Sequence, residues 1–595
     1  MLDLNITATR QRLRDLIRRR IFRRDGRHQH RDGGTRRDKP VEIGTKKLNC
    51  VQAAELAGVF VPHYCWHEAL SVVASCRMCL VEMGDLKDGK VTMQPKVLPG
   101  CQTPVKDGTV IVTGEYDKRD RSLPALPYDP GYTKAAAPGE RAKKAQADTL
   151  EGLLLNHPLD CPVCDKAGEC KLQDFSYKYG RSESRMVDLK NTPPNKPQLS
   201  SKITLFTDRC IMCTRCVRFT REISGTAELQ VVGRGHHEEI DVFPGRPLEN
   251  KLAGNVVDLC PVGALGSKDF LYKQRVWYLK TVDGVCNRCS TGCSTYVDTN
   301  KDIVYRLRAR YNPKAQGHFM CDDGRYGYHH ANSGERFVRP VVKTDGRFKP
   351  TPWSSLLPQL KQEFGDAVKT NAKGVVAVLS PFLTAEEAFL LGTYFKSLSA
   401  DVRLVIGPVP VIGQDDKYPK NAKGEPVEPV KFTIRAEKAP NRLGVEAVLK
   451  HLQGDMIPFA SVAGEELSAM WFAGGYPDPS HLDTLVPTGW KAPALLVAQD
   501  VLPTVMTASA KYVLPATTGF EKDGTFVNHA GYAQTFARAA RPPVETRGEL
   551  QLAYDLLGRK GLVQPAAVRK ELAAAVPFFA ELAPEPQPTP QPASV

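Results

Sequence analysis

Side chains that bind metals are concentrated between residues 65 and 321. The chain has 16 cysteines, of which 15 lie in that stretch and none follows it. There is no secretory signal pattern, so bound metal is favoured over a disulfide framework. Iron–sulfur clusters and structural zinc both require four ligands. By spacing, these cysteines and His157 form a first, second, third and fourth set: Cys65, Cys76, Cys79 and Cys101; His157, Cys161, Cys164 and Cys170; Cys210, Cys213, Cys216 and Cys260; Cys286, Cys289, Cys293 and Cys321.

Spacing separates iron–sulfur clusters from zinc, which usually joins two C-x2-C pairs. The third set, in "CIMCTRCVRF" and "DLCPVGAL", has the C-x2-C-x2-C run and remote Cys-Pro that surround a [4Fe–4S] cubane in bacterial ferredoxins. The first set has a long loop, a tight pair and a remote cysteine, as in plant-type [2Fe–2S] proteins. We therefore predict iron–sulfur clusters at both sets, with zinc as the alternative.

The second set, in "HPLDCPVCDKAGEC", contains an imidazole in place of a fourth thiol. We predict that His157 replaces one thiolate on a [4Fe–4S] cluster, which makes that cluster one unit less negative. The alternative is that His157 caps a helix and the cluster has another ligand. Cys50 stands outside the sets, and the amphipathic "KKLNCVQAAELAG" indicates that it is a buried small hydrophobe.

Regular secondary structure is predicted in two regions, one before the first set and one after residue 335. "KPVEIG" is expected to be a strand, followed by a helix in "GTKKLNCVQAAELAG". Beyond residue 335, "GVVAVLSP", "DVRLVIGPV", "AMWFAGGYPDP" and "APALLVAQD" are typical of strands, and "TAEEAFLLGTYFKSLSA" is typical of a helix. This alternation predicts an α/β region. The Gly-Gly pair in "GGYPDP" is interpreted as a plain turn rather than a phosphate loop.

Length and charge limit the remaining possibilities. A chain of 595 residues exceeds one hydrophobic core, so several domains are expected. The net charge is +15, but residues 1–38 hold twelve Arg, no Lys and five Asp, so the rest is only mildly basic. No nucleic-acid partner is therefore expected. No run of 18 apolar residues occurs, so membrane attachment is expected only through a partner.

The motifs resemble one family in order. "PHYCWHEALSVVASCRMCLVEM", "LLNHPLDCPVCDKAGECKLQD" and "TDRCIMCTRCVRF…CPVGAL" are similar to the signature stretches of the large iron–sulfur subunit of respiratory complex I, the NADH:quinone oxidoreductase. The resemblance implies one [2Fe–2S] cluster on the first set and a [4Fe–4S] cluster on each of the other three. It implies electron transfer from the first set through the third to the second, with the fourth off this path. The fourth set indicates a bacterial member.

The family also implies partners, location and fold. The partners would be the NADH- and flavin-binding subunit and the quinone-arm iron–sulfur subunits, on the cytoplasmic face of the inner membrane, with proton translocation by the whole complex. The fold class is multidomain α+β and α/β: a β-grasp [2Fe–2S] ferredoxin-like domain, a [4Fe–4S] domain with one histidine and three cysteine ligands, ferredoxin-like [4Fe–4S] domains, then a shortened molybdopterin-oxidoreductase-like region. The expected domains are 39–130, 131–200, 201–275, 276–335 and 336–575, between a basic segment, 1–38, and a Pro-rich tail, 576–595.

Residues 1–38 depart from the family pattern. A first strand should fall in "RHQHRDGGTRR", which has no apolar alternation. Three interpretations stand: a nucleic-acid arm, an Arg-rich transit peptide, or upstream sequence that is not the natural start. We expect the last, with the segment disordered and dispensable.

Three rival functions would fit part of the pattern. A molybdenum enzyme would be longer, many carry a cysteine or selenocysteine on the metal, and many have Lys where this chain has Asp323, so no molybdopterin and no catalytic site are expected. An iron–sulfur subunit of an NAD-linked hydrogenase or formate dehydrogenase assembly is the closer alternative. A structural zinc protein would need the same ligands to hold zinc.

Overall fold

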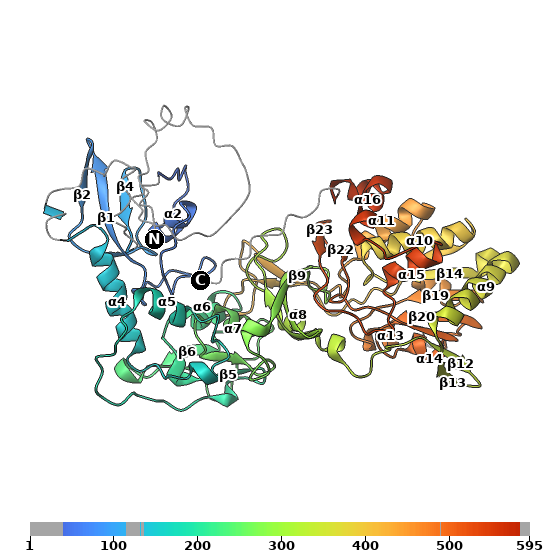
Figure 1. Cartoon of the computed structure of the whole chain (residues 1–595), viewed down its shortest axis with the longest axis horizontal. Coiled ribbons are helices and arrows are strands. Elements are labelled where there is room, and N and C mark those ends of the chain that lie inside the picture. The colour runs from blue at the N-terminus through green and yellow to red at the C-terminus, as the bar shows by residue number, and fades with distance from the viewer. Residues whose placement is uncertain (1–39, 115–130, 133–135, 488, 583–595) are drawn as a thin grey trace.

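The computed structural model describes residues 40–114, 131–132, 136–487 and 489–582. The predictions for residues 1–38 and for most of the Pro-rich tail therefore lie outside the described residues. Figure 1 shows two lobes. One holds the elements up to α7 (Asn255–Leu259), the other holds the α/β region, and β9 (Lys280–Val285) and α8 (Asp322–Tyr326) lie between them.

An antiparallel sheet and a helix form the region of the first set. Strand β1 (Leu80–Lys87) pairs with β2 (Lys90–Met93), β3 (Leu98–Pro99) and β4 (Thr109–Val112). Helix α2 (Cys50–Leu56) begins with a capping box, and Cys50 is fully buried, as predicted. The strand predicted over "KPVEIG" is wrong, because residues 40–43 have no regular structure. Apolar alternation makes a strand only beside a hydrogen-bonded neighbour, and no described strand pairs with this segment.

Short elements hold the second and third sets. Helix α4 (Glu140–Leu154) precedes the second set, and α5 (Lys171–Tyr179) begins directly after Cys170. Helix α6 (Arg215–Glu222) contains Cys216, and α7 ends at Cys260. Two ribbons complete the region, in which β5 (Ile203–Leu205) pairs with β8 (Leu265–Ser267) and β6 (Leu229–Val232) with β7 (Glu239–Val242).

A three-stranded sheet carries the fourth set. Its strand order is β11 (Ile303–Ala309), β10 (Ser294–Asn300), β9. Cys286 follows β9, Cys293 precedes β10, and Cys321 caps α8. Strand ends and a helix start therefore bring the four cysteines of this set to one end of the sheet.

The α/β region is built on an eight-stranded sheet with the order β13-β12-β21-β20-β19-β14-β15-β18. The strands are β12 (Val341–Thr344), β13 (Arg347–Pro350), β14 (Val375–Leu379), β15 (Arg403–Ile406), β18 (Ile457–Pro458), β19 (Ala469–Ala473), β20 (Leu495–Asp500) and β21 (Tyr512–Pro515). From β21 to β18 neighbours are parallel, while β12 and β13 form an antiparallel edge. The four strands and the helix predicted in this region all form.

Helices cover both faces of this sheet. Val375, Ala377 and Leu379 pack in one core cluster, whereas Val376 and Val378 pack in another. This alternation is expected when a parallel strand is buried on both sides. Helices that pack on the first face are α9 (Trp353–Asn371), α10 (Ala385–Leu398), α11 (Arg442–Gln453), α15 (Glu549–Leu556) and α16 (Pro565–Ala575). On the second are α12 (Phe459–Val462), α13 (Ser480–Leu485) and α14 (Val505–Ser509). Two ribbons, β16 (Asp416–Tyr418) with β17 (Phe432–Ile434) and β22 (Gly524–Val527) with β23 (Ala533–Phe536), lie outside the sheet.

The α/β region extends beyond the predicted boundary at residue 575. Pro577–Leu582 form a 3-10 helix whose Phe579 is fully buried in the same core cluster as α16. Phe579 of "VPFFAEL" supplies this apolar contact, whereas Phe578 is about half exposed. We therefore infer that the α/β region continues to Leu582.

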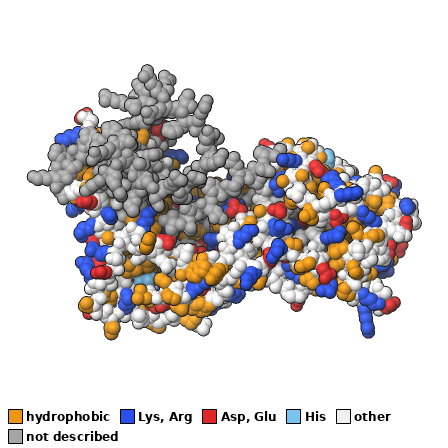
Figure 2. Space-filling model, viewed as in Figure 1, with side chains coloured by type: hydrophobic (Ala, Val, Ile, Leu, Met, Phe, Trp, Pro, Cys, Tyr) orange, Lys and Arg blue, Asp and Glu red, His pale blue; other side chains and the backbone are white. Residues whose placement is uncertain are grey.

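The described helices and the face drawn in Figure 2 show how charge and apolar length are distributed. None of the described helices is both long and apolar enough to cross a bilayer. On the face in Figure 2, Lys and Arg side chains are interspersed with Asp and Glu over both lobes. This mixture is an ordinary solvated surface.

Carboxylates outnumber cations in a buried cluster beside α10. Glu386 pairs with Arg569 at 2.9 Å, and Lys522 lies 2.9 Å from Glu387 and 3.9 Å from Glu549. Burial raises the pKa of Glu387 to about 7, although the charge of Lys522 opposes this shift. Lys522 is thus the one cation that pairs with the two buried carboxyl groups of Glu387 and Glu549. Protonation of Glu387 removes the negative charge that Lys522 does not neutralise.

This cluster predicts a pH-dependent free energy of unfolding. A carboxyl whose pKa is raised by folding stabilises the native state fully below about pH 4.5, and that stabilisation is lost as pH rises through about 7. Glu387→Gln keeps the helix cap of Thr384 without the titration, so its unfolding free energy should vary less over this range, by about 3 kcal/mol. Denaturant titrations at several pH values measure this.

Glu386→Gln is the matched control. It leaves Arg569 without its carboxylate, so it should lower stability at every pH and preserve the pH slope. An unchanged slope in Glu387→Gln would contradict the assignment of the titrating group.

Candidate metal centres

The first set forms a compact group of thiols. All four cysteines are buried, and the Cys65 N–H lies 3.4 Å from the Cys76 sulfur. Hydrogen bonds from the Cys101 and Cys76 thiols hold the pKa of Cys65 well below its usual range. The Cys101 thiol also forms a hydrogen bond with the Cys79 sulfur, which lowers the pKa of Cys79. The loop, the tight pair and the remote cysteine therefore meet as their spacing predicts.

The second set lines one small cavity. His157, Cys161, Cys164 and Cys170 all face it, together with Arg209 and Gly263. The His157 Nδ1 atom is buried and has no hydrogen-bond partner among the described residues. Burial, followed by the charges of Arg209 and Lys190, lowers the pKa of His157 to about 4. The ring is therefore neutral at physiological pH, which is the form that binds a metal.

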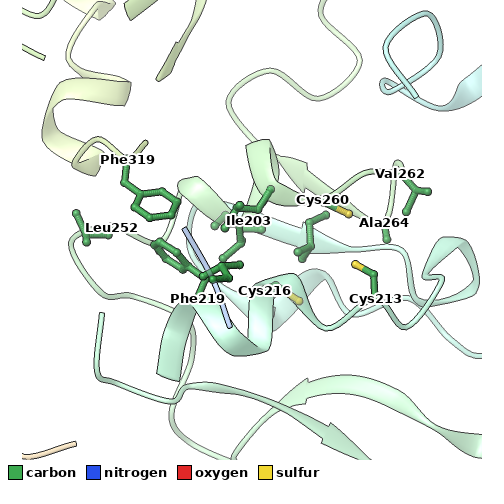
Figure 3. Close-up of a cluster of buried hydrophobic side chains, with 14 of the residues drawn as sticks. Ile203, Cys213, Cys216, Phe219, Leu252, Cys260, Val262, Ala264 and Phe319 are labelled. Carbon is green, nitrogen blue, oxygen red and sulfur yellow. The ribbon is translucent and has the colours of Figure 1, made fainter. Parts of the chain in front are cut away.

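The third set lines a second cavity. Cys210, Cys213, Cys216 and Cys260 surround it with Ile211, Val262 and Ala264. Figure 3 shows the sulfur atoms of Cys213, Cys216 and Cys260 facing a common space. Burial raises the pKa of Cys213 to about 11 and that of Cys216 well above its usual value. Without a bound cation these thiols stay protonated, so metal binding must release protons.

The second and third sets are in direct contact. The Lys171 N–H donates to the Pro261 carbonyl at 3.1 Å, which joins the residues after Cys170 and Cys260. A Cβ atom added to Gly263 would lie 2.1 Å from the Cys164 sulfur. Gly263 therefore lets the loop after Cys260 approach the second cavity closely.

The fourth set lies where the three-stranded sheet meets the α/β region. The Cys321 sulfur accepts the Gly324 N–H at 3.3 Å, and the Cys286 N–H donates to the Cys293 carbonyl at 2.8 Å. Burial, followed by the charge of Cys289, raises the pKa of Cys286 to about 12.

Side chains of the α/β region form hydrogen bonds to the backbone of the fourth-set loop, between Cys289 and Cys293. Gln534 donates to the Gly292 carbonyl at 2.6 Å, and Asn528 donates to the Thr291 carbonyl at 3.2 Å. The hydroxyl of Thr291 itself donates to the Thr433 carbonyl at 2.6 Å.

Residues with a strained backbone conformation lie beside the first and third sets. Ala74 and Arg77 flank Cys76 with φ of 51° and 59°, and Met212 and Thr214 flank Cys213 with φ of 49° and 58°. Non-glycine residues adopt this left-handed conformation rarely and at a cost, often at functional sites. Here it turns N–H groups toward sulfur, for example that of Met212 toward Cys210 at 3.4 Å. Such donors stabilise sulfur that carries negative charge.

The donor sets fit iron–sulfur clusters. Each set offers four sulfur or imidazole donors. The first, third and fourth sets are largely buried, with backbone N–H groups directed at sulfur. The second set lines one cavity, although Cys161 is exposed and His157 is half-buried. No group of three or more His, Cys, Asp or Glu within the described ranges is arranged to hold a single metal ion. A cubane takes one ligand at each of four separate iron atoms, so its ligands need not converge on one point.

Family models match most of the regions that contain these sets. A 2Fe-2S iron-sulfur cluster binding domain matches residues 47–116, and the NADH-ubiquinone oxidoreductase-G iron-sulfur binding region matches residues 146–185. The ferredoxin-like domain of NADH-quinone oxidoreductase subunit 3 matches residues 200–266. Molybdopterin oxidoreductase matches residues 437–559, within the α/β region.

Curated relatives point to the same family. The G subunit of the NADH-quinone oxidoreductase of Rickettsia conorii is 32% identical over 59% of this chain and 47% of its own length. NADH dehydrogenase [ubiquinone] iron-sulfur protein 1 of Solanum tuberosum is 34% identical over 57% of this chain and 42% of its own. The chain is similar to these iron–sulfur subunits over about 60% of its own length. The corresponding G subunit of Streptomyces coelicolor is 33% identical over 58% of this chain and 37% of its own length, so the chain matches half or less of these relatives.

Solved structures match more weakly. A chain of an NAD+-reducing [NiFe]-hydrogenase is 24% identical over 40% of this chain and 87% of its own length, with a TM-score of 0.31. Acetylene hydratase from Pelobacter acetylenicus is 9% identical over 47% of this chain and 69% of its own length, with a TM-score of 0.32. Scores this low support no argument about this chain.

Sequence reasoning missed the residues that join the sets. Gly263, Arg215 and Arg218 all lie in or beside the third-set motifs, yet spacing alone gave them no role. The signal was present in "CTRCVRF", where two arginines three positions apart share one face of a helix whose cysteine is buried.

The contact at Gly263 predicts a local effect on the second set. Gly263→Ala would place a methyl group on the Cys164 sulfur, so the second-set cluster should be lost or its spectrum altered, while the first-set signal persists. Electron paramagnetic resonance and iron analysis of the purified protein measure this. Gly266→Ala is the matched control, because its Cβ would meet nothing nearer than 3.4 Å. Equal effects in both variants would contradict the prediction.

Proposed function

We propose that this chain is the electron-carrying iron–sulfur subunit of an NADH:quinone oxidoreductase of the complex I type. The observation that carries the proposal is the grouping of sixteen donors, most of them buried, into four sets in the family order. It is supported by matches to three iron–sulfur family models and by relatives named as the G subunit of NADH-quinone oxidoreductase. On this proposal the chain has no substrate site and transfers electrons from the NADH and flavin subunit toward quinone.

Four clusters are proposed, one for each set. A [2Fe–2S] cluster would be held by Cys65, Cys76, Cys79 and Cys101, and [4Fe–4S] clusters by the second, third and fourth sets. When bound, these groups accept and release single electrons. The part played by the protein is to supply deprotonated thiols and a neutral His157, to exclude water, and to fix the sets relative to one another.

The contacts of the third set support its place between the first and second. Arg215 and Arg218 of its loop bond to the backbone of the first-set loop. Gly263 and Pro261, which follow Cys260, contact the second set. The fourth set lies on the side of the α/β region, which is consistent with a place off this path.

The proposed partners are the flavin subunit and the quinone-arm iron–sulfur subunits, and the proposed location is the cytoplasmic face of the bacterial inner membrane. The domain boundaries are proposed as predicted, with the α/β region continuing to Leu582. An iron–sulfur subunit of an NAD-linked hydrogenase is the second candidate.

Iron analysis tests the cluster proposal directly. One [2Fe–2S] and three [4Fe–4S] clusters hold about 14 iron atoms per chain. We expect that content after anaerobic reconstitution, together with visible charge-transfer absorption. Stoichiometric zinc together with about six iron atoms per chain or fewer would contradict the proposal.

Substitutions in the second and fourth sets distinguish a cluster on the proposed electron path from a cluster off that path. His157→Ala should disturb one [4Fe–4S] signal, leave the other three clusters intact and slow electron transfer to quinone in the assembled complex. Cys289→Ala should disturb the fourth cluster and reduce assembly more than it reduces the rate per assembled complex. If iron content, spectra and turnover in His157→Ala equal those of the wild type, His157 is not a ligand.

A further inference from the structure

Two buried arginines connect the first and third sets. Arg215 and Arg218 lie on one face of α6, around Cys216, and are 5% and 6% exposed. The Arg218 guanidinium donates to the Ser71 and Cys65 carbonyls, each at 2.5 Å, and to the Cys213 carbonyl at 3.2 Å. One side chain thus bonds the first-set loop and the third-set loop together.

Arg215 repeats this arrangement. Its guanidinium donates to the Trp66 carbonyl at 2.5 Å and to the Leu259 carbonyl at 3.3 Å. Trp66 follows Cys65 and Leu259 precedes Cys260, so these bonds also join the two sets. Both arginines therefore bind backbone next to the predicted ligands rather than other side chains.

Neither arginine pairs with a carboxylate in the described part of the chain. No ion pair is found for either guanidinium, and the Nε atom of each is buried without a hydrogen-bond partner. The acidic groups that act on Arg215 are thiols, those of Cys213, Cys65 and Cys76. A buried cation is costly unless negative charge lies close to it. For Arg215 the thiols of the first and third sets are the source of that charge. Arg218 also has the Glu222 carboxylate four positions on along α6, where Glu222 accepts from the Ser71 N–H and hydroxyl.

We propose that Arg215 and Arg218 are positioning residues that hold the first and third sets together and supply a counter-charge shared by both centres. The inference rests on the proposed function, since it requires clusters at both sets. A positive charge beside a cluster favours its more negative, reduced state. The pair should therefore raise the reduction potentials of both centres together, in addition to setting their separation.

The test is a redox titration of the full chain, loaded with clusters and followed by electron paramagnetic resonance. Arg218→Met removes the charge while keeping an apolar side chain in the same space. We expect both centres to become at least about tenfold harder to reduce, which is about 59 mV for a one-electron couple. The second-set and fourth-set signals should move less.

Two further variants complete the design. Arg221→Met on the same helix is the matched control, because Arg221 is exposed, and it should leave every potential unchanged. Arg218→Lys keeps the charge but loses the planar fork, so the potentials should stay near those of the wild type while the magnetic interaction between the two centres weakens.

The outcomes separate the inference from the proposed function. Unchanged potentials in Arg218→Met, with both centres intact, would overturn the shared counter-charge. A shift at the third set alone would overturn the sharing. If Arg218→Met loses both clusters but Arg218→Lys keeps the clusters and their potentials, the role of the charge is supported. If both variants lose the clusters, Arg218 only holds the two loops together and the shared counter-charge is overturned. Zinc in place of iron in the wild-type chain would instead refute the proposed function, whatever the variants show.

Discussion

Burial of sulfur beside uncompensated positive charge is the constraint on which the cluster-bearing lobe depends. Of the fifteen cysteines in the four sets, all but Cys161 and Cys210 are fully buried. Burial alone would keep these thiols protonated, as the raised pKa values of Cys213 and Cys286 indicate. Left-handed turns that direct N–H groups at sulfur, and arginines that lack carboxylate partners, are what a buried anionic centre requires.

The same constraint explains why so few regular elements surround the sets. A loop that places three sulfurs around one centre cannot also follow a strand or a helix. Elements therefore begin or end at ligands: α5 starts after Cys170, α7 ends at Cys260 and α8 is capped by Cys321. The core is nevertheless continuous, since one cluster of buried side chains contains cysteines from all four sets.

The α/β region acts as a structural support for the fourth set. Its own core fills both faces of the eight-stranded sheet. Contact with the fourth set is both apolar and polar. Phe432 and Phe520 pack in the core cluster that contains Cys286 and Cys321, and Val285 packs against Phe526 and Phe536. Gln534 and Asn528 add hydrogen bonds to the fourth-set loop.

The sequence by itself predicted the four donor sets and the resemblance to one family, and it determined the alternation of strands and helices after residue 335, because ligand spacing and apolar periodicity are local properties. It failed at "KPVEIG", where the outcome depends on whether a neighbour is present to pair with a strand. It also gave no indication that Phe579 is covered by the α/β core. Only the tertiary structure decided which sets touch, since the contacts of Arg218 with Cys65 and of Gly263 with Cys164 join residues about 100 or more positions apart. No local pattern encodes such contacts; they follow from how the elements pack.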